Sequence, residues 1–94
     1  MRIVSQDGRF DLPYECFVVG IYAANDTSII AYTVNSDDDA FLDLAEYSTK
    51  EKAVKAMEML RTEYEKFQET KSINGGYFAL DYPKVFRFPQ DSEV

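Results

Sequence analysis

The sequence predicts an α+β fold, in which five or six short, mainly antiparallel strands form a sheet and one long helix packs on one face of it. Short runs rich in β-branched and aromatic residues are separated by the turn sequences Asp7-Gly8 and Asn25-Asp26. A later segment, about 49–71, has its apolar residues at helical spacing instead. The chain has 94 residues, the length of one domain, so we expect residues 1–94 to form a single domain.

The strands are predicted from apolar alternation and from the turns that bound them. We expect strands at 2–5, 10–12, 16–24, 27–34, 41–47 and 85–88, with 77–80 as a further candidate. Asp7-Gly8 predicts a hairpin between the first two strands, which Pro13 ends, and Asn25-Asp26 predicts a second hairpin. The run at 16–24 is rich in Val, Ile, Phe and Tyr, and we expect it to be a well-buried strand. The single cysteine, Cys16, opens this run, and we expect it to be buried as a small hydrophobic residue.

The helix has the clearest pattern. Ser48 and Glu51 form a predicted capping box, in which each side chain bonds a free amide at the start of the helix. An apolar stripe follows at steps of four and three residues: Ala53, Met57, Leu60, Tyr64 and Phe67. Gly75-Gly76 then favours a turn, so we expect the helix to end near residue 71. Residues 90–94 are expected to form a flexible tail.

The charge is unevenly placed along the chain. The net charge is −7, yet residues 50–71 carry six basic and five acidic residues, so the acidity belongs to the strands and loops. It is concentrated in Asp37, Asp38, Asp39, Asp43 and Glu46. Such a cluster is often a solvated loop that aids solubility, but it can also steer a protein onto a basic partner. These five residues are the predicted partner-binding surface.

Several classes of function are disfavoured by residues that the sequence lacks. There is no histidine, the commonest general base and metal ligand, and the one cysteine cannot form a zinc site. We therefore predict a protein that is not an enzyme, with no catalytic residues, metal or cofactor. The acidity disfavours direct nucleic-acid binding. No apolar stretch approaches the ~20 residues of a membrane span, and no signal peptide is recognisable, so the expected location is the cytosol.

A second candidate site lies among the aromatic residues near the C-terminus. Tyr77 and Tyr82, with the cations Arg9 and Arg87, could line a pocket for a nucleotide if the chain brings them together. This alternative site favours a protein that sequesters a small signalling molecule. A short chain of this kind would gain stability by forming a homo-oligomer, and that state stays open.

Three segments carry a family resemblance: Val4–Gly8 with Asp11–Glu15, Ala45–Ala53 running into Ala56–Arg61, and Phe86–Asp91. Together they resemble small proteins encoded by phages and prophages of Gram-positive bacteria. The resemblance implies a shared fold and action in the host bacterial cytosol, and it brings no catalytic residues. It favours an anti-CRISPR protein that blocks a type II RNA-guided nuclease through the acidic surface. The alternatives are a sponge for a nucleotide immune signal and a phage accessory or assembly protein.

Overall fold

The computed structural model describes residues 1–33, 40–73 and 85–94, and the last helical turn, 69–73, by its backbone alone. Its strands are β1 (Arg2–Val4), β2 (Asp11–Pro13), β3 (Val18–Tyr22), β4 (Asn25–Tyr32), β5 (Leu42–Glu46) and β6 (Val85–Arg87). The helices are α1 (Lys50–Ile73) and two 3-10 turns, η1 (Tyr14–Cys16) and η2 (Asp91–Glu93). The α+β class is confirmed, as are both predicted hairpins and the long helix. The candidate strand at 77–80 lies outside the described residues.

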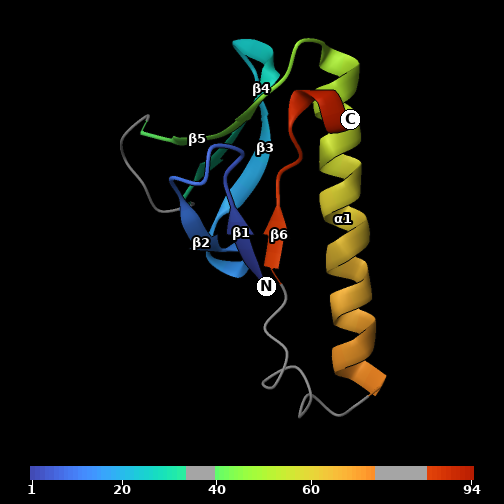
Figure 1. The fold of residues 1–94 in the computed structure, drawn as a ribbon. Coiled ribbons are helices and arrows are strands. Elements are labelled where there is room, and N and C mark those ends of the chain that lie inside the picture. The colour runs from blue at the N-terminus through green and yellow to red at the C-terminus, as the bar shows by residue number, and fades with distance from the viewer. Residues whose placement is uncertain (34–39, 74–84) are drawn as a thin grey trace.

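The strands form two three-stranded sheets rather than the single larger sheet that the sequence predicts (Figure 1). The first sheet has the order β2-β1-β6 and the second has the order β3-β4-β5. Pro13 ends β2 and η1 turns the chain, so the first hairpin does not continue into the second. The open edge of β1 instead pairs in parallel with β6, which places Ile3 opposite Phe86. That partner is too distant in the sequence for any local pattern to predict it.

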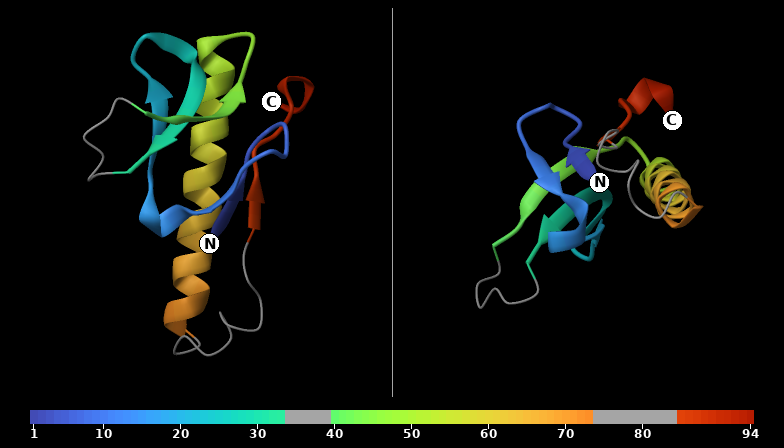
Figure 2. Two further views of the ribbon diagram at one scale, coloured as in Figure 1. Left: turned by 90° about the vertical axis from the view of Figure 1, so that its left-hand side faces the viewer. Right: turned by 90° about the horizontal axis from the view of Figure 1, so that it is seen from below.

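The helix lies along one side of the molecule and both sheets lie on the other side (Figures 1 and 2). It packs against β3 and β4 through the predicted stripe, where Ala53 and Leu60 are fully buried and Met57 nearly so. Farther along, Tyr64 is half-buried, and its ring packs edge-on against Tyr14 at a centroid distance of 4.7 Å. The stripe prediction is therefore confirmed, with burial decreasing toward the end of the helix.

The start of the helix differs from the predicted capping box. The helix begins at Lys50, and the side-chain oxygen of Thr49 accepts a hydrogen bond from the Lys52 amide at 3.2 Å. Ser48 instead donates its amide and hydroxyl hydrogens to the carboxylate of Asp91, at 2.7 and 3.1 Å. The predicted role of Ser48 is wrong because this carboxylate, from a distant part of the chain, binds Ser48 outside the helix.

Residues 89–93, which we call the C-terminal clasp, pack back onto the body of the protein. The hydroxyl of Tyr47 and the side-chain amide of Gln6 both donate to the carbonyl of Pro89, at 2.8 and 3.1 Å. Gln90 donates to the carbonyl of Gln6 at 2.8 Å, and Lys52 pairs with Asp91 at 3.2 Å. The structure thus places most of the expected flexible tail in η2, with hydrogen bonds to Gln6, Ser48 and Lys52.

The burial of β3 also differs from the expectation. This strand is at the edge of the second sheet and is half-buried throughout, although the sequence predicts a well-buried strand. Cys16 is exposed at the end of η1, while its neighbour Phe17 packs against the core. The buried-cysteine prediction is wrong because η1 turns the chain just before β3 begins.

Candidate functional site: an acidic groove between the two sheets

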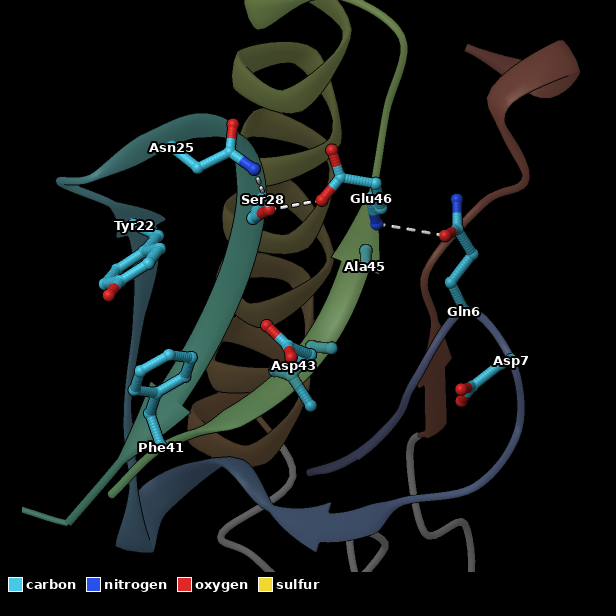
Figure 3. A pocket seen from close by; sticks show the side chains of 10 residues that line it. Gln6, Asp7, Tyr22, Asn25, Ser28, Phe41, Asp43, Ala45 and Glu46 are labelled. Carbon is cyan, nitrogen blue, oxygen red and sulfur yellow. Dashed lines mark hydrogen bonds between the residues drawn. The ribbon is translucent and has the colours of Figure 1, made fainter. Parts of the chain in front are cut away.

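A groove of about 460 Å³ lies where the turn of the first hairpin meets the outer face of the second sheet (Figure 3). We call it the acidic groove. Its lining residues are Gln6, Asp7, Tyr22, Asn25, Ser28, Phe41, Asp43, Leu44, Ala45 and Glu46. The lining includes three carboxylates and no lysine or arginine. Volumes of this size are at the small end of the range for ligand sites in proteins.

Glu46, at the end of β5, is anchored by two hydroxyl groups of the neighbouring strand β4. Ser28 donates a hydrogen bond to one carboxylate oxygen, and Thr27 Oγ1 lies 2.6 Å from the other. Ser28 in turn accepts a hydrogen bond from Asn25 Nδ2 at 3.0 Å. The hydrogen bonds from Ser28 and Thr27 lower the pKa of Glu46. Glu46 therefore carries its negative charge throughout the neutral range.

Asp7 enters the groove from the β1–β2 turn. Gly8 has φ +78°, the left-handed conformation that glycine adopts readily, and this closes the turn. The backbone amide of Arg9 and the hydroxyl of buried Ser5 both donate to Asp7 Oδ1, at 3.0 and 2.7 Å. These two hydrogen bonds lower the pKa of Asp7, so it is also ionised at neutral pH.

Asp43 and two aromatic rings form the other end of the groove. Figure 3 shows Asp43 between the aromatic pair and Asp7. Asp43 is exposed while the next residue, Leu44, is buried, as the predicted alternation along this strand requires. The rings of Tyr22 and Phe41 lie 4.7 Å apart between centroids, inclined at 40°. Phe41 is 37% exposed, which is high for so large an apolar side chain.

Gln6 joins the parts that form the groove. Its backbone amide donates to the carbonyl of Leu44 at 2.7 Å, and its side-chain oxygen accepts from the amide of Glu46 at 3.0 Å. Its side-chain nitrogen donates to Pro89 in the C-terminal clasp. Gln6 therefore connects the first hairpin, the edge of β5 and the clasp, and it fixes how Asp7 faces Glu46.

The charged side chains that line the groove are all acidic. Across residues 1–33, 40–73 and 85–94, the ion pairs do not involve Asp7, Asp43 or Glu46. Within the same residues no group of three or more His, Cys, Asp or Glu side chains is placed to hold a metal ion. An organic cation, such as a basic side chain, suits three separated carboxylates beside aromatic rings.

The predicted site residues separate into two groups. Asp43 and Glu46 both line the acidic groove, whereas Asp37, Asp38 and Asp39 lie outside the described residues.

The alternative ligand site has less support. Arg87 lines a different hollow together with Phe88 and Gln90, but Arg9 does not line it, and the Arg9 guanidinium lies over the ring of Phe10. Tyr77 and Tyr82 are outside the described residues.

Eight of the ten lining residues are not among the predicted site residues, and Gln6, Asp7, Tyr22 and Phe41 are four of these eight. The sequence predicts Asp7 only as a turn residue, although an Asp before Gly commonly turns its carboxylate onto its own turn. Tyr22 is in β3 and Phe41 precedes β5, two strands that are not neighbours in their sheet, and Gln6 bonds to residues about 40 and 80 positions away. No local pattern shows either relation.

No helix in the described part of the chain is both long and apolar enough to cross a membrane. Comparisons of the chain with protein-family models, with curated proteins and with solved structures gave no match. The function is therefore inferred from the acidic groove and the charge around it.

Proposed function

We propose that this protein acts by binding, and that the acidic groove docks onto a basic surface of a partner protein. The observation that carries the proposal is the set of three carboxylates, Asp7, Asp43 and Glu46, in a groove whose lining has no basic side chain. A docked cation would be attracted by all three at short range. The net charge of −7 would add long-range steering toward a basic partner.

The pKa shifts favour binding over proton transfer. A carboxylate that acts as a general acid needs a raised pKa so that it keeps its proton near neutral pH. Hydrogen bonds lower the pKa of both Glu46 and Asp7, which keeps these groups charged and unprotonated. This is the arrangement that a cation-binding surface requires, and it supports a role other than that of an enzyme.

We further propose that the partner is a bacterial defence protein, and that a type II RNA-guided nuclease is the first candidate. Such a nuclease holds nucleic acid in a positively charged channel, to which an acidic surface is complementary. The resemblance to small phage-encoded proteins supports this class of target. On this proposal, the protein would bind over the channel with its acidic groove against basic side chains, and it would exclude the nucleic acid.

The test is size-exclusion chromatography of the protein mixed with a purified type II nuclease, with and without guide RNA, at low and moderate salt. Asp43→Lys reverses one charge in the groove, and Asp26→Lys is the matched control because Asp26 is exposed and does not line it. We expect salt-sensitive co-elution that Asp43→Lys abolishes and Asp26→Lys preserves.

Other results would distinguish an error in the location of the interface from an error in the identity of the partner. Co-elution that both variants preserve would place the interface elsewhere on the protein. Co-elution with no form of the nuclease would exclude this target. A replacement of Asp37, Asp38 and Asp39 by Asn, in the same assay, tests whether these acidic residues act together with the groove.

A further inference from the structure

The aromatic rings at one end of the acidic groove indicate which cationic side chain the groove accepts. Carboxylates attract both lysine and arginine, and aromatic faces add a further preference for arginine. The Tyr22 and Phe41 rings are held together across the sheet at 4.7 Å, and both rings line the same groove as the carboxylates (Figure 3). A planar guanidinium stacks on such rings and is more weakly hydrated than an ammonium group.

The carboxylates retain capacity for a ligand. An ionised carboxylate offers about four lone-pair positions. Ser28 and Thr27 occupy one position on each oxygen of Glu46, which leaves about one on each. Both hydrogen bonds to Asp7 from the described residues end on Oδ1. The bonded hydroxyls orient Glu46 without saturating it, so this carboxylate can still accept hydrogen bonds from a cationic ligand.

The size of the groove limits what can enter it. A volume of about 460 Å³ suits one extended side chain better than a helix or a strand. We propose that the acidic groove holds a single arginine side chain of the partner, with its guanidinium stacked against Tyr22 and Phe41 beside Asp43, and with Asp7 and Glu46 adding negative charge from the other end of the groove. This inference rests on the proposed function and specifies the partner residue that the groove selects.

The test uses three short peptides that differ at one position: acetyl-Gly-Arg-Gly-amide, its lysine counterpart and its citrulline counterpart. Each is titrated into isotope-labelled protein while backbone amide shifts are followed by NMR. We expect the arginine peptide to shift the amides of Tyr22, Asp43 and Glu46, and to bind at least about fivefold more tightly than the lysine peptide. Citrulline is planar but neutral, so its peptide should bind much more weakly than both.

Two variants test the stacking directly. Tyr22→Leu and Phe41→Leu should each bring the arginine-to-lysine affinity ratio toward one. Tyr32→Leu is the matched control, because Tyr32 is 43% exposed on the same sheet but does not line the groove. The shift map of the unsubstituted protein gives an independent result if a variant fails to fold.

The outcomes distinguish this inference from the proposed function. Equal binding of the arginine and lysine peptides at the groove would overturn arginine selection and leave an acidic docking site. Binding of citrulline as tight as that of arginine would overturn the role of the carboxylates. If no peptide moves the groove amides while the nuclease complex still forms, the inference fails alone. If neither binding is seen, the proposed function fails with it.

Discussion

At the scale of single residues, Glu46 combines two roles. It links β4 to β5 through Ser28 and Thr27, and it supplies charge to the acidic groove. The same hydrogen bonds that hold the side chain stabilise its ionised form. Folding stability and groove charge are therefore coupled at this position, and both depend on the pH.

This coupling predicts how the stability gain from Glu46 varies with pH. The pKa is lower in the folded state than in the unfolded chain, so the gain is present above the unfolded pKa, about 4.3. It is lost as the pH falls through the lowered folded-state value. Melting temperatures of the protein and its Glu46→Gln variant should thus differ most near pH 7 and converge in acid. A difference that stays constant with pH would contradict this account.

The Thr27 hydroxyl has two acceptors within hydrogen-bond distance, Glu46 and Asn25. Its hydroxyl oxygen lies 2.6 Å from Glu46 and 2.8 Å from Asn25 Oδ1, yet it has one hydrogen to donate. Donation to Asn25 would leave Ser28 as the main donor to Glu46. A cationic side chain in the acidic groove would stabilise the ionised carboxylate from the other side.

At the scale of elements, the two described glycines have opposite roles. Gly8 closes the β1–β2 turn with a positive φ, a conformation that costs an L-residue about 1–2 kcal/mol. Gly20 lies within β3 at an ordinary φ, and an added Cβ there would meet no atom within 4 Å.

The prediction is a pair of opposite stability changes. Gly8→Ala should lower the free energy of unfolding by about 1–2 kcal/mol. Gly20→Ala should raise it by about 0.5–1 kcal/mol, because glycine loses more freedom than alanine when a strand forms. Urea unfolding of both variants measures the two changes. If Gly20→Ala destabilised the protein as much as Gly8→Ala, the expectation that β3 accepts a Cβ at position 20 would be wrong.

The elements that the sequence predicts well are those defined by local pattern. The stripe through Ala53, Met57 and Leu60 predicts both the helix and its buried face, and alternation correctly separates exposed Asp43 from buried Leu44. Each of these relations spans a few residues, over which side-chain period and burial are directly linked. Two of the five predicted partner-binding residues, Asp43 and Glu46, are thus placed in the groove.

The parts that the sequence does not predict depend on distant partners. Asp91 binds Ser48 from 43 positions away and takes it out of the predicted cap. Gln6 is bonded across 40 residues to Glu46 and across 83 residues to Pro89. β1 pairs with β6, which is also distant in the sequence, and this pairing places β6 in the first sheet. None of these contacts has a periodic signature.

At the scale of the whole molecule, the C-terminal clasp connects the helix to both sheets. Asp91 accepts hydrogen bonds from Ser48 and from Lys52, and the Ser48 amide is the main cause of its lowered pKa. A carboxylate at this position also lies beside the first turn of α1, where the helix dipole favours negative charge. The clasp therefore stabilises the start of the helix that packs on the second sheet.

The clasp predicts that a single change near the C-terminus lowers global stability. Asp91→Ala should lower the free energy of unfolding, because it removes the carboxylate that binds the Ser48 amide and the Lys52 ammonium group at the start of the helix. Ser92→Ala is the matched control, since Ser92 is its exposed neighbour in η2. Urea unfolding compares the two. If Asp91→Ala left the free energy of unfolding unchanged, the result would favour a flexible tail at 90–94, as the sequence predicts.

The position of β1 between β2 and β6 also determines the order in which the protein can mature on a ribosome. β2 is available soon after β1, but β6 follows roughly 80 residues later, about 4 to 16 seconds at typical rates of synthesis. Until then the edge of β1 that pairs with β6 is open, and Ile3 lacks its neighbour Phe86. This protein therefore has a vulnerable period before release, during which a chaperone can bind or another nascent chain can pair with that edge.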